Sequence, residues 1–189
     1  MADAGAFLRF QDGLQTLCET LEAAAQVVIA SVHGCALAGG LELTLACDIV
    51  VAAEDAELGD EHIRRNLLPG GGGSQRLPRK LGLARGIYLL TGRRMSGLEA
   101  ERVGLVAQAV AAADLTAATL KLAGEIARAD GRALAAMKLM ARRGMELPLK
   151  EGLWLERWMQ HRYRSESSAM DSGVRDFAAN SRKGAPKQP

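Results

Sequence analysis

The sequence predicts an α/β protein in which buried strands alternate with helices. Two short apolar runs rich in β-branched residues, 27–32 and 48–53, are typical of strands that are covered on both faces. A helical pattern precedes the first run, and a second helix separates the two runs. Strands that alternate with helices pair in parallel, so the order helix–strand–helix–strand over residues 6–53 indicates the α/β class.

The elements of this first segment are predicted from periodicity and from one pair of glycines. Apolar residues recur at helical spacing over residues 6–25, namely Phe7, Phe10, Leu14, Leu17, Cys18 and Leu21. The strand over 27–32 is closed by His33 and Gly34. Gly39 and Gly40 then open a helix over 41–47, which leads into the strand over 48–53.

The middle of the chain begins with four consecutive glycines, 70–73. A helical pattern over 74–80 contains Pro78, which suits the first turn of a new helix better than a helix interior. The pattern continues as a helix over 83–90. Ser96-Gly97-Leu98-Glu99 has the form of a capping box and predicts the start of another short helix.

The second half of the chain is almost entirely helical after a strand over 104–110. Helices are predicted over 114–129, 131–144, 148–165 and 168–183. We therefore expect an α/β core over residues 1–113, a helical region over 114–183 and a frayed tail over 184–189.

Composition and charge exclude several classes of function. The chain has 189 residues, with 24 Lys and Arg against 22 Asp and Glu, so its net charge of +2 gives no footprint for nucleic acid. No apolar run is long enough to span a membrane, and the N-terminus lacks the pattern of a secretory signal. Cys18, Cys35 and Cys47 form no CxxC pair, which predicts small buried side chains in a reducing, cytoplasmic compartment. With only three histidines and no HExxH motif, no metal site is expected.

The first segment that could carry chemistry is 36–42, where two glycines and a helix follow a strand. Unpaired backbone N–H groups at the helix start could hold a developing oxyanion, and Glu42 would lie beside them. The alternative is a tight turn in which Glu42 stabilises the helix dipole, and this segment alone favours that alternative. No GxGxxG motif is present, so a dinucleotide site is not predicted.

Two further segments are candidates. In Leu58–His62 the imidazole of His62 could carry a proton near neutral pH, although charge-rich pentapeptides are usually solvated loops. In Pro69–Leu77 the glycines expose backbone donors that could hold phosphate or water. This segment lacks the lysine of a P-loop, and Arg76 stands where a GxSxG motif requires glycine. A flexible connection is the alternative, but strong apolar patterns lie on both sides.

Together the three segments resemble the crotonase superfamily, the enoyl-CoA hydratase/isomerase group. The family pattern N-G-x-A-x-G-G-G-x-E-L is matched by His33–Leu43, and C-D-I is matched by Cys47–Ile49. F-G-x-P-E corresponds to Leu58–His62, and I-P-G-x-G-G-T-Q-R-L corresponds to Leu68–Leu77. No gap is needed over residues 27–82. The resemblance continues at Thr91–Ser96, at Gly104–Val106 and at Ser172–Phe177.

The resemblance implies a β-β-α superhelical spiral with a C-terminal helical trimerisation region. It also implies an acyl-CoA substrate, with coenzyme A as part of the substrate and neither cofactor nor metal. The N–H of Gly39 would be one of two oxyanion-hole donors, Glu42 would match the first catalytic glutamate, and the N–H of Gly70 would hold the catalytic water. Phe177 and Lys183 match a helix that can touch the acyl pocket or the CoA of a neighbouring subunit.

The chain departs from the family pattern in two places. His62 stands where the family has its second catalytic glutamate, and Glu61 is its rival for the acid–base role. A charged histidine there suits proton delivery to an enolate, and therefore isomerisation or another enolate chemistry, better than activation of water by paired carboxylates. The alternative is that the acid–base role is lost and His62 only shapes the pocket. Family members also begin with several dozen more residues, which supply the second oxyanion donor. Met1 matches a methionine just after them, so we expect an N-terminally incomplete spiral and a weak catalyst.

The resemblance therefore implies an enzyme that hydrates or isomerises an enoyl-CoA through a thioester enolate. Two alternatives stay open: another crotonase reaction, such as thioester hydrolysis or decarboxylation, or a truncated chain that binds CoA or a partner subunit without catalysis. We expect a homo-oligomer, either a trimer or a hexamer, and neither nucleic acid nor membrane as a partner. Large aromatic residues cluster on the C-terminal helices, where they are typical of interfaces: Trp154, Trp158, Tyr163 and Phe177.

Overall fold

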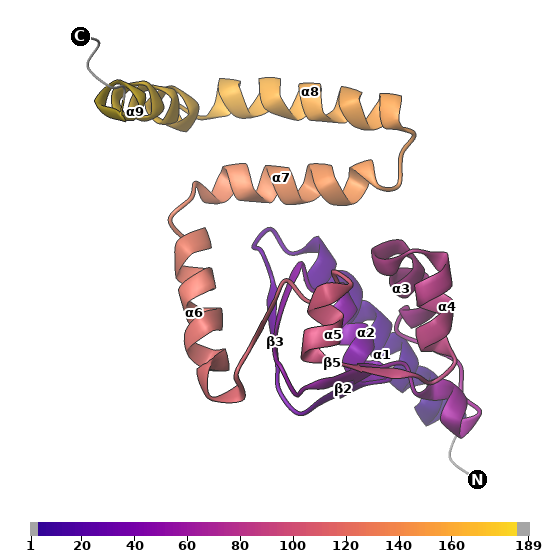
Figure 1. Cartoon of the computed structure of the whole chain (residues 1–189). Coiled ribbons are helices and arrows are strands. Elements are labelled where there is room, and N and C mark those ends of the chain that lie inside the picture. Colours follow the sequence, from indigo (N-terminus) through magenta and orange to yellow (C-terminus); the bar gives the residue numbers. More distant parts are fainter. Residues whose placement is uncertain (1–3, 185–189) are drawn as a thin grey trace. The chain divides into compact units, whose positions relative to one another are not determined.

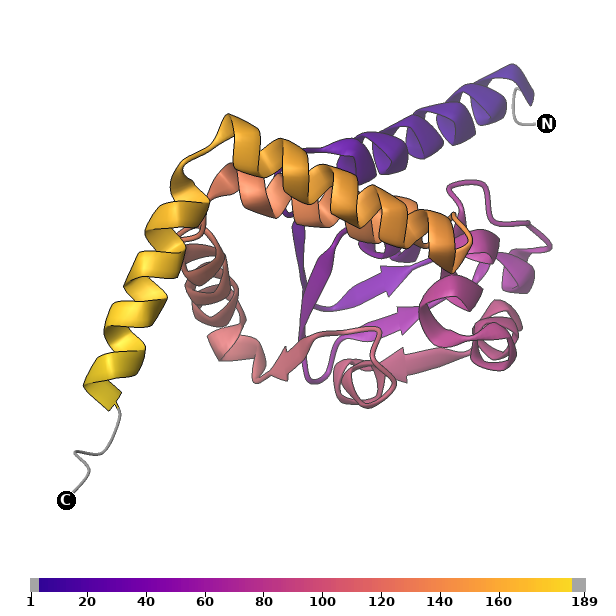
Figure 2. The same cartoon turned by 90° about the horizontal axis from the view of Figure 1, so that it is seen from above.

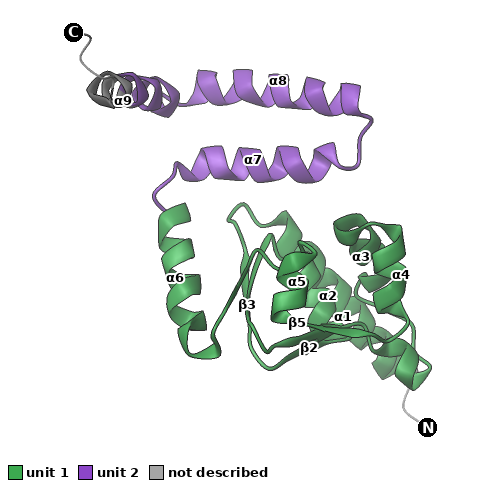
Figure 3. Cartoon of the chain, viewed as in Figure 1, with its two compact units in different colours: residues 1–126 green, residues 127–189 purple. Residues whose placement is uncertain are grey.

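The computed structural model describes residues 4–184, with the side chains of residues 4, 176 and 179–184 outside the described part. The chain forms two compact units, residues 1–126 and residues 127–189 (Figure 3).

The first sheet of unit 1 is parallel and has β3 (Ile49–Ala53) in its centre. β1 (Ile29–Val32) pairs with one edge of β3, with Ile29 opposite Ile49, and β6 (Gln108–Val110) pairs with the other edge. The predicted strands and their parallel pairing are confirmed (Figure 1 and Figure 2). β6 is shorter than predicted because residues 104–106 form a turn, in which the N–H groups of Leu105 and Val106 both bond to the Ala100 carbonyl.

A second sheet consists of three strands of three residues each. β2 (Cys35–Leu37) pairs in parallel with β4 (Glu57–Gly59), and β4 pairs antiparallel with β5 (Arg94–Ser96). The sequence patterns do not predict these strands, because three residues are too few to show an alternation of apolar and polar positions. They matter for the site, since β2 leads directly into a helix and β4 ends one residue before Asp60.

Helices surround the two sheets of unit 1. They are α1 (Ala4–Ala23), α2 (Gly39–Ala46), α3 (Gly73–Leu81), α4 (Leu83–Leu90), α5 (Gly97–Arg102) and α6 (Leu115–Ile126), with 3₁₀ turns η1 (His62–Arg65) and η2 (Ala112–Asp114). In sequence order α1 contacts α2, α2 contacts α3, and α3 contacts α4. α6 packs against β1 and β3, so it belongs to the same unit as the sheet.

The core of unit 1 is centred on β3. Four consecutive residues of this strand, 50–53, are at most 3% exposed, as expected for the middle strand of a parallel sheet that is covered on both faces. Leu41 and Leu45 of α2 and Leu77 of α3 complete the buried cluster on one side. Two acidic side chains, Glu42 and Asp60, are as deeply buried as these leucines.

Two local predictions have different outcomes. The capping box is confirmed, because the Ser96 side chain accepts the N–H of Glu99 and the Glu99 carboxylate accepts the N–H of Ser96. The placement of Pro78 in a first helical turn is wrong, since it lies inside α3. α3 has nine residues, so the missing N–H removes few helical bonds. The proline also forms the contact with α4, where a Cβ on Gly86 would lie 2.8 Å from the Pro78 backbone.

The three cysteines are free thiols with different environments. Cys18 and Cys47 are buried as predicted, but Cys35 is exposed, so the prediction for Cys35 is wrong. Cys35 begins β2, where alternate side chains point to opposite faces, and the neighbouring Ala36 takes the buried position. Among the described helices, none is long and apolar enough to cross a membrane.

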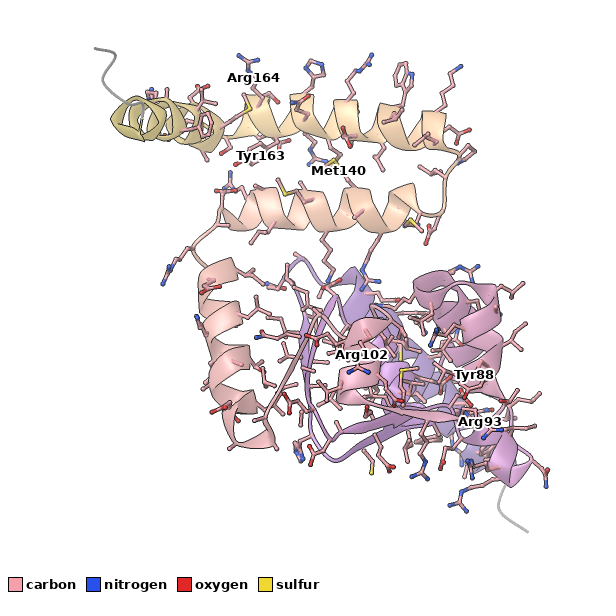
Figure 4. All side chains as sticks on the ribbon, viewed as in Figure 1. Tyr88, Arg93, Arg102, Met140, Tyr163 and Arg164 are labelled. Atoms are coloured by element: carbon pink, nitrogen blue, oxygen red, sulfur yellow. The ribbon has the colours of Figure 1, made fainter. Side chains whose placement is uncertain are left out.

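Unit 2 is a helical hairpin followed by a third helix. α7 (Gly131–Gly144) and α8 (Leu149–Glu166) run antiparallel, and α9 (Ala169–Gly184) follows, so the three predicted helices are confirmed to within one residue. The Asp130 carboxylate caps α7 by accepting the N–H of Ala133, and it also accepts the Tyr163 hydroxyl from α8. Tyr163 and Met140 lie between the two helices in Figure 4. α7 and α8, both fully described, contain no buried residue.

Because α5 lies in close contact with β3, a single methyl group added at Gly97 is expected to reduce the stability of the protein strongly. A Cβ on Gly97 would lie 1.9 Å from the Ala53 carbonyl oxygen, so the Gly97→Ala substitution is expected to lower the free energy of unfolding by at least the ~1–3 kcal/mol typical of overpacking. The matched control is Gly124→Ala in α6, where the space is open and a gain of about 0.5–1 kcal/mol is expected. Urea unfolding measures both, and equal stabilities of the two variants would contradict the packing.

Candidate active site

The site begins at the turn that joins β2 to α2. Ala38 has a φ of 50° and a ψ of −118°, a conformation that non-glycine residues rarely adopt and that is often found at functional sites. Its N–H donates to the Gly59 carbonyl at 3.0 Å, which ties the turn to the end of β4. The turn therefore brings the start of α2 next to the segment that follows β4.

The first turn of α2 presents unpaired backbone donors. The first helical bond is donated by the N–H of Glu42 to the Ala38 carbonyl at 3.0 Å. The N–H groups of Gly39 and Gly40 precede this bond and have no acceptor among the described residues. Such donors at a helix N-terminus favour a negatively charged ligand atom.

Glu42 lies one turn further along α2 and is fully buried. Its Oε1 atom accepts two backbone N–H groups, from Gly71 and from Gly73, each at 2.8 Å. Its Oε2 atom has no hydrogen-bond partner among the described residues and lies 3.8 Å from Nε2 of His62. One carboxylate oxygen is therefore held by two backbone N–H groups, and the other has no hydrogen-bond partner among the described residues.

The glycine segment 70–73 fits closely around this carboxylate. A Cβ on Gly71 would lie 2.9 Å from Glu42 Oε2 and from the Leu14 side chain of α1. A Cβ on Gly73 would lie 3.0 Å from Asp60 Oδ2 and 3.2 Å from Glu42 Oε1. Glycine is needed at both positions because backbone N–H groups must approach the carboxylate closely.

The ion pair of Arg76 with Glu22 holds the glycine segment in place. Arg76 of α3 donates from Nε and Nη2 to the two carboxylate oxygens of Glu22 in α1, at 2.8 and 2.6 Å. Its Nη1 donates to the Gly71 carbonyl at 2.5 Å. The hydrogen bonds to Glu22 raise the pKa of Arg76, so the guanidinium stays charged. The Arg76 side chain thereby connects α1, α3 and the glycine segment.

His62 lies between two buried carboxylates. Its Nδ1 is 3.0 Å from Asp60 Oδ1, and its backbone N–H donates to the same oxygen at 3.2 Å. Its Nε2 faces Glu42 at 3.8 Å, as described above. The His62 side chain is 12% exposed, whereas Asp60 is 1% exposed, so His62 has the more accessible side chain of the pair.

Glu61 is held by arginines. Its Oε1 accepts Nε of Arg94 at 2.5 Å and lies 3.4 Å from Nε of Arg64. Arg94 also pairs with Glu57 of β4 at 2.7 Å. The hydrogen bond from Arg94 lowers the pKa of the Glu61 carboxyl, which keeps it ionised and paired.

The structure brings some of the predicted site residues together. Glu42 and His62 face each other, Gly39 begins the same helix as Glu42, and Gly70 precedes the two N–H donors that bind Glu42. Phe177 lies on α9 in unit 2 and is 75% exposed, and the side chain of Lys183 lies outside the described part. No group of three or more His, Cys, Asp or Glu in the described chain is arranged to hold a metal ion.

Asp60 was missed by sequence reasoning. The available signal was its position two residues before His62, because an aspartate commonly accepts the N–H of the second residue after it. What the sequence could not show is that this aspartate is buried and also binds the imidazole.

These features define an α/β protein with an acidic, histidine-containing site at a helix N-terminus. The family described as enoyl-CoA hydratase/isomerase matches residues 6–184. The chain therefore belongs to the enoyl-CoA hydratase/isomerase family, and the family predicted from the sequence is confirmed.

Individual relatives agree with this assignment. A probable enoyl-CoA hydratase of Mycobacterium tuberculosis is 44% identical over 134 residues, which cover 70% of this chain and 52% of that protein. The mitochondrial enoyl-CoA hydratase domain-containing protein 2 of Bos taurus is 42% identical over 160 residues, which cover 82% of this chain and 53% of that protein. This chain spans about half the length of the curated relatives it matches.

A solved structure confirms the crotonase fold. The crystal structure of an enoyl-CoA hydratase from Bacillus anthracis superimposes with a TM-score of 0.90 at 34% identity. The superposition covers 94% of this chain and 69% of that one.

The ion pair of Glu61 predicts a pH-dependent contribution to stability. Because Arg94 lowers the pKa of Glu61 below its ordinary value of 4.5 in the folded state, the contribution is complete above pH 4.5 and is lost as the pH falls through the lowered pKa. The Glu61→Gln variant is therefore expected to be less stable than the wild type at pH 7, with a difference that shrinks below pH 4.5. Urea unfolding at a series of pH values measures this difference. The control is Glu54→Gln, which changes an exposed glutamate in the turn between β3 and β4. A difference in stability between Glu61→Gln and the wild type that persists unchanged at low pH would contradict the ion pair with Arg94.

Proposed function

We propose that this chain forms an enolate-stabilising site that hydrates or isomerises an enoyl-CoA thioester. The observation that carries the proposal is the arrangement of Glu42, with one carboxylate oxygen held by two backbone N–H groups and the other directed toward His62. A buried base with one free oxygen, close to a second proton carrier, is what proton transfer at carbon needs. Family membership supplies the substrate class, an acyl-CoA thioester.

The backbone donor of the site would be Gly39. Its N–H lies at the start of α2 and lacks an acceptor among the described residues, so it can donate to the thioester carbonyl oxygen. When a proton leaves the carbon next to the thioester, negative charge moves onto that oxygen. A fixed donor at a helix N-terminus stabilises this charge more in the transition state than in the substrate, which is the condition for catalysis.

Glu42 and His62 would exchange the protons. In isomerisation, Glu42 Oε2 takes a proton from the carbon next to the thioester, and the C–H electrons move into the enolate. Protonated His62 Nε2 then delivers a proton to the far carbon of the enolate. The proton on Glu42 returns to His62 across the 3.8 Å between Oε2 and Nε2, which restores the starting state. In hydration, Glu42 and His62 would instead exchange protons with a water molecule held by the N–H of Gly70.

Isomerisation is the reaction that His62 favours. Hydration in the family pattern uses two glutamates, and here one of the two positions is an imidazole. Glu61, the rival carboxylate, is paired with Arg94, so we assign it a structural role. Three exposed apolar side chains between His62 and Gly70 would provide a surface for the acyl chain: Ile63, Leu67 and Leu68.

Substitutions of the three acid–base candidates test the proposed reaction. Glu42→Gln and His62→Ala are each expected to lower kcat by about 10²–10⁴-fold, because each removes a proton carrier. Glu61→Gln is the matched control and is expected to keep kcat. Turnover is measured with crotonyl-CoA and with a 3-enoyl-CoA, and a higher kcat on the second is expected.

The outcome that contradicts this assignment is full activity of His62→Ala together with loss of activity in Glu61→Gln. Tight binding of an acyl-CoA without turnover of any enoyl-CoA would instead favour a chain that binds CoA without catalysis. Far-ultraviolet circular dichroism confirms that each variant is folded.

We further propose that the chain is cytoplasmic and self-associates as a trimer or hexamer through unit 2. Several apolar side chains of unit 2 are more than half exposed: Met137, Met145, Leu149, Leu153, Trp154, Trp158, Val174 and Phe177. Exposed aromatic residues of this kind are typical interface anchors. Of the four aromatic residues expected at the interface, Tyr163 is not among these exposed side chains, and its hydroxyl donates to Asp130 within the unit. Phe177 and Lys183 would then reach the acyl pocket or CoA of a neighbouring subunit.

Light scattering tests the proposed oligomer. The wild type at micromolar concentration is expected to have the mass of three or six chains, and the double variant Trp154→Ala/Trp158→Ala is expected to shift toward the monomer. Leu83→Ala is the control, because this equally exposed leucine lies on α4 in unit 1. A monomeric wild type would contradict the proposal.

A further inference from the structure

We propose that Asp60 is a positioning residue that orients His62 for proton exchange with Glu42. The inference rests on the proposed function of the site, which it deepens by adding a residue that neither the family pattern nor the sequence analysis assigns. Asp60 acts through His62 and does not contact the substrate.

The geometry of Asp60 determines which nitrogen of His62 carries hydrogen. Asp60 Oδ1 lies 3.0 Å from Nδ1 and 3.2 Å from the backbone nitrogen of His62. A carboxylate can only accept hydrogen bonds, so the Nδ1 atom at this distance is the protonated one. Nε2 is then the nitrogen that exchanges protons, and it is the nitrogen that faces Glu42 Oε2 at 3.8 Å.

The burial of Asp60 separates this role from an ordinary turn. An aspartate that only accepts a backbone N–H in a turn would be satisfied at the surface, where its carboxylate is solvated. Asp60 is instead 1% exposed, and its Oδ2 has no hydrogen-bond partner among the described residues. Burying a carboxylate in this way costs free energy unless a positive charge or hydrogen bonds offset the cost. The imidazole of His62 is the group placed to do so.

Asp60 and Glu42 come from different parts of the chain, but both carboxylates lie beside Gly73. The Cβ position of Gly73 is 3.0 Å from Asp60 Oδ2 and 3.2 Å from Glu42 Oε1. An imidazolium at His62 would therefore be attracted by two buried carboxylates at once. When a proton moves from Glu42 Oε2 to His62 Nε2, the Nδ1–H bond to Asp60 stays intact and Asp60 stabilises the positive charge that forms. In serine proteases, likewise, the histidine exchanges the proton while a buried aspartate orients the imidazole and stabilises its positive charge.

The first test reads the tautomer of His62 directly by ¹⁵N-detected NMR of histidine-labelled chain at about pH 8, above the ordinary titration range of histidine. His62→Gln identifies its resonances among those of His33 and His161. In the wild type the Nδ1 resonance of His62 is expected to be that of a protonated nitrogen. In Asp60→Asn the amide can donate to Nδ1, and the resonance is expected to move to that of an unprotonated nitrogen. An unprotonated Nδ1 in the wild type, or no change on substitution, would overturn the proposal.

The second test is a double-mutant cycle on turnover. Asp60→Asn is expected to lower kcat on a 3-enoyl-CoA by about 10²–10⁴-fold, with KM nearly unchanged, because it misorients the proton carrier. In the His62→Ala background, Asp60→Asn is expected to have no further effect, since Asp60 acts only through His62. Asp55→Asn, an exposed aspartate in the turn before β4, is the control and should leave kcat unchanged.

The outcomes separate this inference from the function on which it rests. An equal loss of kcat on adding Asp60→Asn to His62→Ala would show a general structural role and would overturn the proposal, as would unchanged kcat in the single variant. If the wild type turns over no enoyl-CoA, the proposed function fails, and the NMR measurement alone decides whether Asp60 orients His62. Thermal unfolding followed by circular dichroism shows that each variant retains its fold.

Discussion

The structure of the site depends on the buried carboxylate of Glu42 and the two backbone N–H groups that it accepts. The hydrogen bonds from Gly71 and Gly73 join α2 to the start of α3, although the two glycines lie 29 and 31 positions after Glu42 in the sequence. Because Gly73 is the first residue of α3, the carboxylate also lies at the positive end of that helix dipole. These interactions offset part of the cost of burying a charge, and they leave one oxygen of the carboxylate free.

Three acidic side chains near the site have three different environments, and this difference gives each a separate role. Asp60 and Glu61 are neighbours in sequence, yet Asp60 is buried against His62 while Glu61 is paired with Arg94. Glu42 is buried but has one unpaired oxygen. Asp60 is also buried with one unpaired oxygen, but it binds Nδ1 of His62 through its other oxygen. Glu42 is proposed as the base because its unpaired oxygen is the one that faces Nε2 of His62.

The two units are stabilised in different ways. Unit 1 buries an apolar cluster around β3, whereas α7 and α8, as described, bury no side chain completely and expose methionines, leucines and tryptophans. Arg162 stacks over the Trp158 ring at 5.7 Å from its centroid, but the ring remains 54% exposed. A helical hairpin of this kind gains little stability from its own apolar side chains, because they are only partly removed from water.

The sequence by itself determined the α/β class, the long helices and the family, because periodicity and glycine spacing are local signals that need no tertiary contacts. It also indicated that Glu42 and His62 belong to one site. The three-residue strands, the interior position of Pro78 and the role of Asp60 were decided only by the tertiary structure. Each depends on a partner distant in sequence: strand pairing for β2 and β4, Gly86 for Pro78, and burial beside Gly73 for Asp60. Long-range packing determines which side chains are buried and which atoms they face, and no local pattern carries that information.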